Sequence, residues 1–217
     1  MKWQKWAYMS INGYIRVKNS IENEIVIEKS RFIGYTKMTE SEEEAKEFIE
    51  SIRKKHPFAT HNCYAYVCEQ GKILRFSDDG EPQGTAGIPM LEVLKNRNLK
   101  DTTVVVTRYF GGIKLGAGGL VRAYSSSTSE ALEKAGVEEN LLANLLKISF
   151  GYEKYSLFLK FIEKYKHKII SQDFAEEISI TVAIKVDDNE FIDKLTDCFL
   201  GKVVIKNEGQ TFVVFGD

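Results

Sequence analysis

The 217-residue sequence predicts an α+β protein of two domains, residues 1–140 and 141–217. Strands and helices are both predicted along the first part. The last part follows the order strand, helix, strand, strand, helix, strand, which is typical of the ferredoxin-like fold. All seven arginines precede residue 123, and this change in charge pattern favours two units with different roles.

Local signals place the elements of the first domain. Ser41 and Glu44 have the spacing of a capping box, and apolar residues follow at helical spacing, so a helix should run to about Lys55. A polar loop then precedes a helix from Gly87 to Arg97. The other expected elements are strands at 24–27, 31–36, 62–69, 72–76 and 102–109 and a helix at 120–135.

The second domain shows the clearest strand pattern. Apolar and polar residues alternate strictly over 178–186, which predicts a strand with one exposed face. Asp188 is expected to cap a helix that follows. The remaining elements are expected as strands at 145–150, 168–172, 203–205 and 212–215 and a helix at 153–165.

Composition excludes several classes of protein. Thirty basic and 31 acidic residues give a net charge of −1, so there is no overall positive charge for sequence-blind nucleic-acid binding. Apolar runs are far shorter than the ~20 residues of a membrane span, and no secretory signal opens the chain. Three cysteines, an odd number, favour reduced thiols. A cytoplasmic protein without a membrane partner is therefore expected.

A glycine-rich segment between a strand and a helix is the strongest candidate site. Residues 102–128 carry three cations and no acid, and free N–H groups at the helix start could bind an anion such as an RNA phosphate. The pattern is neither a P-loop nor a dinucleotide fingerprint. Alternatively, the glycines only permit tight packing and the cations are solvated. The candidate anion- or nucleic-acid-binding residues are Arg108, Tyr109, Gly111, Gly112, Lys114, Gly116, Gly118, Gly119 and Arg122.

An acidic turn precedes the Gly87 helix. Its three carboxylates, Asp78, Asp79 and Glu81, could hold Mg²⁺ or act as acid and base, although their spacing is not that of an EF-hand. Turn formation and the helix dipole explain the same residues. We favour a rigid recognition loop without a metal or other cofactor. The residues assigned to it are His61, Asp78, Asp79, Glu81, Gly84 and Thr85.

Histidine and cysteine also occur close together on a predicted strand. His61 and Cys63 share one strand face, whereas Cys68 lies on the other, so a zinc site is disfavoured. A cysteine nucleophile paired with His61 remains an alternative, but no catalytic residue is assigned. His56 and His167 lie at lysine-rich helix ends, where solvated side chains are expected.

Aromatic residues accompany arginines on neighbouring predicted strands. Exposed aromatics of this kind can stack on the bases of single-stranded RNA, whereas buried ones belong to the core. The residues concerned are Tyr64, Tyr66, Phe76, Tyr109 and Phe110, beside Arg75 and Arg108.

Two long blocks, Asp78–Pro89 and Val104–Tyr124, give the sequence a specific resemblance. Together with the shorter segments Lys29–Ile33 and Ala59–Tyr66, they resemble the Impact/YigZ family over nearly the whole chain. The resemblance implies an N-terminal domain of the ribosomal-protein S5 second-domain type. It also implies a C-terminal domain similar to the ferredoxin-like fifth domain of elongation factor G.

Function is implied less directly by this resemblance. Eukaryotic Impact proteins carry an additional RWD domain and regulate translation by binding a ribosome-associated activator of an initiation-factor kinase. The present chain resembles the bacterial branch, so that partner is not carried over. Residues before Met9 depart from the family start, and Met9 is expected to be the native initiator.

Two functional hypotheses follow. The first is a non-catalytic protein that binds RNA, the ribosome or a translation-associated protein and modulates translation. The second is a phosphate- or nucleotide-binding enzyme that uses the glycine-rich loop, with Mg²⁺ on the cluster of Asp78, Asp79 and Glu81. The second rests on analogy with small-metabolite kinases of related fold.

Overall fold

The structure, a computed structural model, describes residues 13–215. The chain divides into two compact units, one formed by Tyr14–Glu138 and the other mainly by Glu139 and the residues that follow. Both units combine helices with antiparallel strands, so the α+β prediction is confirmed. The division lies inside one long strand, two residues before the expected boundary. The expected start at Met9 lies outside the described residues.

The N-terminal unit is built on one five-stranded sheet. Its strands are ordered β2-β3-β6-β4-β5, and every neighbouring pair is antiparallel. The elements of this unit are β1 (Gly13–Val17), β2 (Ile21–Ile27), β3 (Ser30–Met38), α1 (Glu42–Lys55), β4 (His61–Cys68), β5 (Ile73–Ser77), α2 (Gly87–Asn96), β6 (Thr102–Tyr109) and α3 (Gly116–Ala135).

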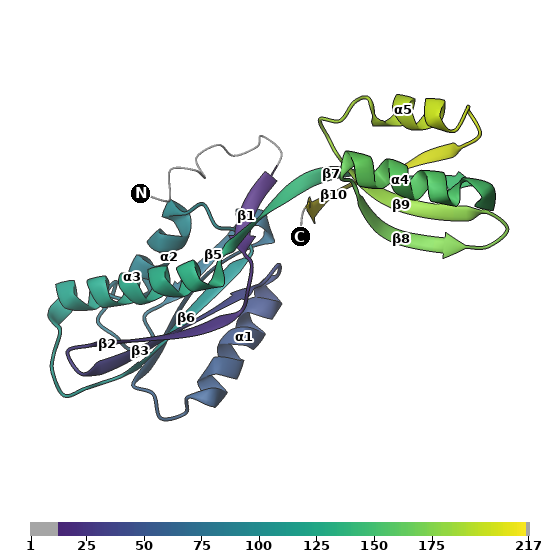
Figure 1. The fold of residues 1–217 in the computed structure, drawn as a ribbon. Coiled ribbons are helices and arrows are strands. Elements are labelled where there is room, and N and C mark those ends of the chain that lie inside the picture. The colour runs from purple at the N-terminus through teal and green to yellow at the C-terminus, as the bar shows by residue number, and fades with distance from the viewer. Residues whose placement is uncertain (1–12, 216–217) are drawn as a thin grey trace. The chain divides into compact units, whose positions relative to one another are not determined.

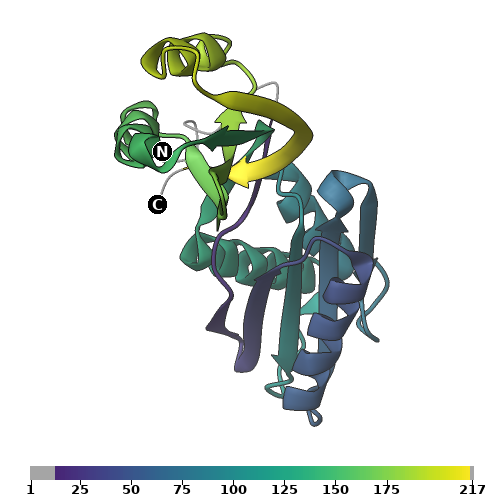
Figure 2. The same ribbon diagram turned by 90° about the vertical axis from the view of Figure 1, so that its right-hand side faces the viewer.

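Helices cover both faces of this sheet. Helices α2 and α3 pack on one face, where Cys63, Val104 and Val106 join the main core. Helix α1 packs on the other face against Val105 and Tyr66 (Figures 1 and 2). Because β6 is central and buried on both faces, its β-branched run is continuous rather than alternating.

The capping box at the start of α1 is confirmed. The Ser41 hydroxyl accepts a hydrogen bond from the Glu44 amide at 3.2 Å, and the Glu44 carboxylate accepts one from the Glu40 amide at 2.8 Å. The two bonds satisfy N–H groups that the first turn leaves without helical partners. Helix α1 then ends at Lys55, as expected from Pro57 two residues later.

The C-terminal unit has the strand order of a ferredoxin-like fold. The strands β10-β7-β9-β8 pair in this order with antiparallel neighbours, and β1, which also pairs with β7, is the fifth strand of the sheet. Aromatic residues of α4 and α5 pack against it. The elements are β7 (Val137–Phe150), α4 (Tyr155–Tyr165), β8 (Lys168–Phe174), β9 (Ile178–Lys185), α5 (Phe191–Cys198) and β10 (Val204–Val214). The predicted order of strands and helices is therefore confirmed.

Several local predictions are wrong. Helix α3 begins at Gly116 instead of Leu120, because Leu115 and Leu120 both pack on the core and hold the first turn in helical form. The two last strands are one irregular strand, β10, paired with β7. Strand β1 is not expected from the sequence; within the N-terminal unit, Ile15 bridges Leu99.

The two histidines expected in solvent instead contact side chains of the protein. His56 lies between two tyrosine hydroxyls, with Nε2 2.6 Å from Tyr35 and Nδ1 2.9 Å from Tyr109. The His167 side chain is 3% exposed, and its Nε2 lies 2.9 Å from an oxygen of Asp188. Asp188, the expected cap of α5, lies two residues before its N-cap position, Glu190. Burial lowers the pKa of both histidines.

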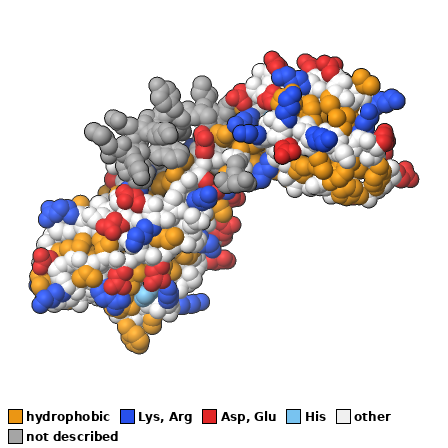
Figure 3. Space-filling model, in the orientation of Figure 1, with side chains coloured by type: hydrophobic (Ala, Val, Ile, Leu, Met, Phe, Trp, Pro, Cys, Tyr) orange, Lys and Arg blue, Asp and Glu red, His pale blue; other side chains and the backbone are white. Residues whose placement is uncertain are grey.

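The surface of the N-terminal unit is mixed in charge. On the face seen in Figure 3, acidic and basic side chains are interspersed with apolar ones. No helix among residues 13–215 has the length and apolarity needed to cross a bilayer.

Candidate functional site

The acidic turn after β5 serves first to build the start of α2. Asp78 accepts hydrogen bonds from the amides of Ala86 at 3.0 Å and Gly87 at 2.8 Å through Oδ1, and from Gly84 at 2.8 Å through Oδ2. The adjacent position, Ala86, supplies no side-chain cap. A carboxylate at a helix N-terminus is favoured by the free amides and by the dipole. Asp78, which lies nine residues before the first residue of α2, therefore caps this helix.

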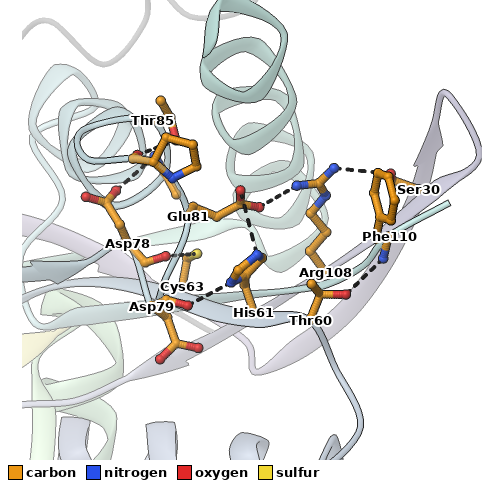
Figure 4. A network of polar contacts seen from close by, with 12 residues as sticks. Ser30, Thr60, His61, Cys63, Asp78, Asp79, Glu81, Thr85, Arg108 and Phe110 are labelled. Carbon is orange, nitrogen blue, oxygen red and sulfur yellow. Dashed lines mark hydrogen bonds and ion pairs between the residues drawn. The ribbon is translucent and has the colours of Figure 1, made fainter. Parts of the chain in front are cut away.

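Asp79 joins the same turn to other elements. Its Oδ2 accepts the Asn62 amide at 2.6 Å, and its Oδ1 lies 3.1 Å from Nη2 of Arg53. The Asp78 and Asp79 carboxylates point away from each other (Figure 4). Among residues 13–215, no group of three or more His, Cys, Asp or Glu side chains is arranged to hold a metal ion. The carboxylate cluster considered for Mg²⁺ is thus not assembled in the described part of the chain.

Glu81 is the one carboxylate of the turn that enters the interior. Its Oε1 accepts Nη1 of Arg108 at 2.6 Å and the Tyr124 hydroxyl at 2.8 Å. The side chains of Glu81 and Arg108 are only 3% and 6% exposed. Burial is the main cause that raises the pKa of Tyr124, so its hydroxyl keeps the proton that it donates.

Arg108, a candidate anion-binding residue of the glycine segment, is therefore buried, and the alternative of a solvated cation does not hold for it. Its guanidinium lies 5.4 Å from the Phe32 ring centre and 5.6 Å from that of Phe110. Nη2 reaches the Ser30 hydroxyl at 3.4 Å, whereas Nε has no hydrogen-bond partner among the described residues. Strand alternation places Arg108 on the α3 side of β6, where Glu81 supplies the opposite charge that a buried guanidinium requires.

His61 is oriented by the same turn. Its Nδ1 lies 2.8 Å from the backbone carbonyl of Asp79, which can only accept, so Nδ1 carries a proton. Nε2 then faces Glu81 Oε2 at 3.8 Å (Figure 4). The sequence places His61 in this loop cluster, and the geometry shows which ring nitrogen is left for a ligand.

The cysteines do not complete a site with His61. Cys63 donates through Sγ to the Asp78 carbonyl at 2.9 Å, and burial raises the pKa of its thiol. Cys68 belongs to the core on the α1 face, where burial raises its pKa to about 11. A protonated, buried thiol is a poor nucleophile and a poor metal ligand. The zinc and cysteine-nucleophile alternatives are therefore not supported.

The glycines of the segment after β6 have different roles. A Cβ on Gly111 would lie 2.0 Å from the backbone carbon of Lys29, so this glycine permits close packing on the β2–β3 turn. Gly112 and Gly116 have φ of 86° and 68°, a region that favours glycine. Gly118 and Gly119 lie in the first turn of α3 rather than in the expected loop.

A cavity of about 390 Å³ lies where the acidic turn meets the start of α3. Leu115, the N-cap position of α3, provides no side-chain hydrogen bond, and the first turn contains no acidic residue. The amides at this helix start therefore lack a cap from a side chain. The cavity is lined by Thr60, His61, Glu81, Pro82, Arg108, Phe110, Lys114, Leu115, Gly116, Ala117 and Leu120.

Comparisons with known proteins place this architecture in a family. The profile of the Impact N-terminal domain matches residues 28–132, which include the acidic turn and most of α3. The IMPACT family member YvyE of Bacillus subtilis (strain 168) is 45% identical over 205 residues, with 94% of each chain covered. The chain belongs to the IMPACT family. The IMPACT family member YigZ of Escherichia coli (strain K12) is 38% identical over 181 residues, covering 82% of this chain and 89% of its own.

A solved structure agrees with this assignment. The crystal structure of a hypothetical protein superimposes with a TM-score of 0.60 at 34% identity. The match covers 90% of this IMPACT family chain and 97% of the solved one. The likeness therefore extends over both units.

In this IMPACT family member, five of the predicted site residues line the cavity. The other ten do not line it: Asp78, Asp79, Gly84 and Thr85 shape the turn, Tyr109 contacts His56 on the α1 face, and Arg122 is exposed on α3. Gly111, Gly112, Gly118 and Gly119 are likewise absent from the cavity lining. The residues brought together are His61, Glu81, Arg108, Lys114 and Gly116.

Sequence reasoning misses three polar side chains that contribute to this IMPACT site. Thr60 accepts the Phe110 amide at 3.0 Å, Ser30 accepts the Gly111 amide at 3.2 Å, and Tyr124 donates to Glu81. Tyr124 follows Leu120 at helical spacing, which is a signal for the same buried face of α3. Thr60 lies just before β4 and Ser30 is the first residue of β3, and neither position carries such a signal.

The aromatic platform considered for RNA bases is not formed as one surface. Tyr66 is 2% exposed and Tyr109 is half-buried, whereas Phe76 and Phe110 are 44% and 48% exposed. Among the aromatics considered, Phe110 is the one that lines the cavity of this IMPACT chain.

Proposed function

We propose that this IMPACT family chain is a non-catalytic cytoplasmic protein that binds RNA, in the free state or on the ribosome, and thereby modulates translation. The contact would be made at the cavity where α3 begins. The carrying observation is the helix N-terminus that lacks a side-chain cap and opens beside Lys114 and Arg108. Helix amides and cationic side chains together favour phosphate.

Two further features support this proposal. Lys114 is exposed at the cavity, so it can reach a phosphate without breaking an internal contact. Phe110 is exposed beside it and offers a flat surface on which a base can stack. The resemblance to Impact proteins, whose eukaryotic members regulate translation, supports the step from RNA binding to translation.

The domain resemblances belong to the same proposal. We expect the N-terminal unit to be of the ribosomal-protein S5 second-domain type and the C-terminal unit to be similar to the fifth domain of elongation factor G. The βαββαβ order of the second unit supports the latter expectation. The Mg²⁺-dependent enzyme has less support, because the oxygens of Asp78 accept backbone amides and those of Asp79 contact the Asn62 amide and the Arg53 guanidinium.

RNA binding is tested by fluorescence anisotropy of a labelled single-stranded RNA at several salt concentrations. Affinity should fall steeply with salt, and Lys114→Ala should weaken it several-fold and reduce the slope of log K against log salt by about 1. Lys72→Ala is the matched control, because Lys72 is exposed and lies outside the cavity. Absence of binding at the lowest salt, or equal loss in both variants, would contradict the proposal.

A further inference from the structure

We infer that the cavity at the start of α3 takes a terminal phosphate monoester, such as the phosphorylated end of an RNA, rather than a phosphodiester within a chain. This inference rests on the proposed function for the RNA part of the ligand. Its chemistry follows from the donors, the depth and the charge of the cavity.

Two independent groups of donors converge on the cavity. The first is the start of α3, where Gly116 and Ala117 line the space and no side chain caps the helix. The second is Arg108, which is 5% exposed and lines the cavity, and whose Nε has no hydrogen-bond partner among the described residues. A buried donor without an acceptor is costly and calls for a missing partner. An anion seated between the two groups would supply that acceptor.

Depth distinguishes the two kinds of phosphate. Arg108 and Glu81 line the cavity together with Phe110 and Pro82, and the side chains of Arg108 and Glu81 are almost fully enclosed. A monoester is attached through one oxygen, so its phosphoryl group can be inserted while the rest of the ligand stays outside. A phosphodiester is flanked by a sugar on both sides and would be held at the surface. A volume of about 390 Å³ lies within the range of small-ligand sites, large enough for a phosphate with an attached sugar.

Charge points in the same direction. Glu81 and Arg108 neutralise each other at 2.6 Å, so the carboxylate does not by itself repel an anion. Lys114 and the positive end of the α3 dipole then give the cavity a net attraction for an anion. A monoester carries about −1.5 to −2 charges at pH 7 and has three acceptor oxygens, whereas a diester carries one charge. The monoester is therefore the better match to several donors.

The test compares RNAs of one sequence that differ only at their ends. Oligonucleotides with a 5′-hydroxyl, a 5′-phosphate or a 3′-phosphate are titrated by fluorescence anisotropy, with inorganic phosphate and a nucleoside 5′-monophosphate as competitors. We expect one phosphorylated end to bind at least tenfold more tightly than the hydroxyl end. The competitor arms separate an RNA end from a free small phosphate as the source of the group.

A matched pair of α3 variants assigns the effect to the cavity. Ala117→Asp places a carboxylate at the helix start, which favours the helix through its dipole but occupies the anion position. Ser126→Asp adds the same charge at an exposed position of α3 outside the cavity. The preference for the phosphorylated end should disappear in Ala117→Asp and persist in Ser126→Asp. Thermal melting confirms that both variants are folded.

The outcomes separate this inference from the proposed function. Equal binding of all RNA ends would overturn the inference and leave RNA binding intact. Binding of the monophosphate without any RNA would support the monoester chemistry and overturn the RNA proposal. Loss of the preference in Ser126→Asp as well as in Ala117→Asp would overturn the assignment to the cavity, and no binding of any probe would overturn both proposals.

Discussion

A buried carboxylate beside an anion site is unfavourable unless its charge is compensated. Glu81 meets this condition through Arg108 at 2.6 Å and through the hydroxyl of Tyr124 at 2.8 Å. The Arg108 guanidinium depends on Glu81 for its counter-charge, because the two rings beside it, Phe32 and Phe110, carry no negative charge. At the scale of the residue, Glu81 therefore sets how much of the positive charge of Arg108 is available to a ligand.

Replacing Glu81 by glutamine tests this balance. Glu81→Gln retains a carbonyl acceptor for Tyr124 but leaves Arg108 without its counter-charge, which should lower stability by about 3 kcal/mol. The same uncompensated charge should increase phosphate affinity, so added phosphate should raise Tm more in the variant than in the wild type. Glu92→Gln on the exposed side of α2 is the control. A smaller phosphate effect in Glu81→Gln would show that this carboxylate is not beside the anion.

Within one element, glycines of similar appearance meet different constraints. The segment from β6 into α3 brings Gly111 against the backbone at Lys29, where a side chain has no room. Gly118 lies in the first turn of α3, and its nearest neighbour would be the flexible end of Arg122 at 3.6 Å. The segment therefore requires a glycine at Gly111 for close packing, whereas Gly118 has room for a side chain.

The two alanine substitutions should therefore differ in their effect on stability. Gly111→Ala forces the β2–β3 turn to move and should destabilise the protein by roughly 3 kcal/mol, as overpacking does. Gly118→Ala should be neutral or stabilising by up to about 1 kcal/mol, because alanine favours the helix. Urea unfolding followed by circular dichroism measures both. Equal destabilisation would mean that α3 does not begin before Leu120.

The C-terminal unit contains a histidine, His167, whose side chain is buried. His167 is stacked on Tyr165 and packs edge-on against Phe191. Its pKa is lowered, chiefly by burial and further by Lys185, although Asp188 acts in the opposite direction. The folded state therefore takes up a proton less readily than the unfolded state, and stability should fall as the pH drops below about 6.5.

Removal of this group should reduce the loss of stability in acid. His167→Gln is compared with the wild type by urea unfolding at pH 7.5 and pH 5.5, with Lys160→Gln, exposed on α4, as the control. The decrease in the free energy of unfolding between the two pH values should be smaller in His167→Gln than in the other two proteins. An identical decrease in all three would exclude His167 as its source.

The sequence by itself determined the α+β class, the order of strands and helices in the second unit and the caps of α1. These follow from local periodicity and from hydrogen bonds between residues three or four apart, as Ser41 and Glu44 show. It also located the two segments that form the candidate site. Such signals depend only on residues that are close in the sequence, so they can be recognised without knowledge of the tertiary packing.

Only the tertiary structure decided what each polar residue of those segments does. Strand alternation assigns Arg108 to a face of β6 but cannot say that Glu81, 27 residues away, buries its charge there. Likewise, nothing local tells that Asp78 caps α2 while its neighbour Asp79 binds the Asn62 amide. The partner of a buried charge is selected by long-range packing, because burial without a partner costs more free energy than the local preference of any single residue supplies.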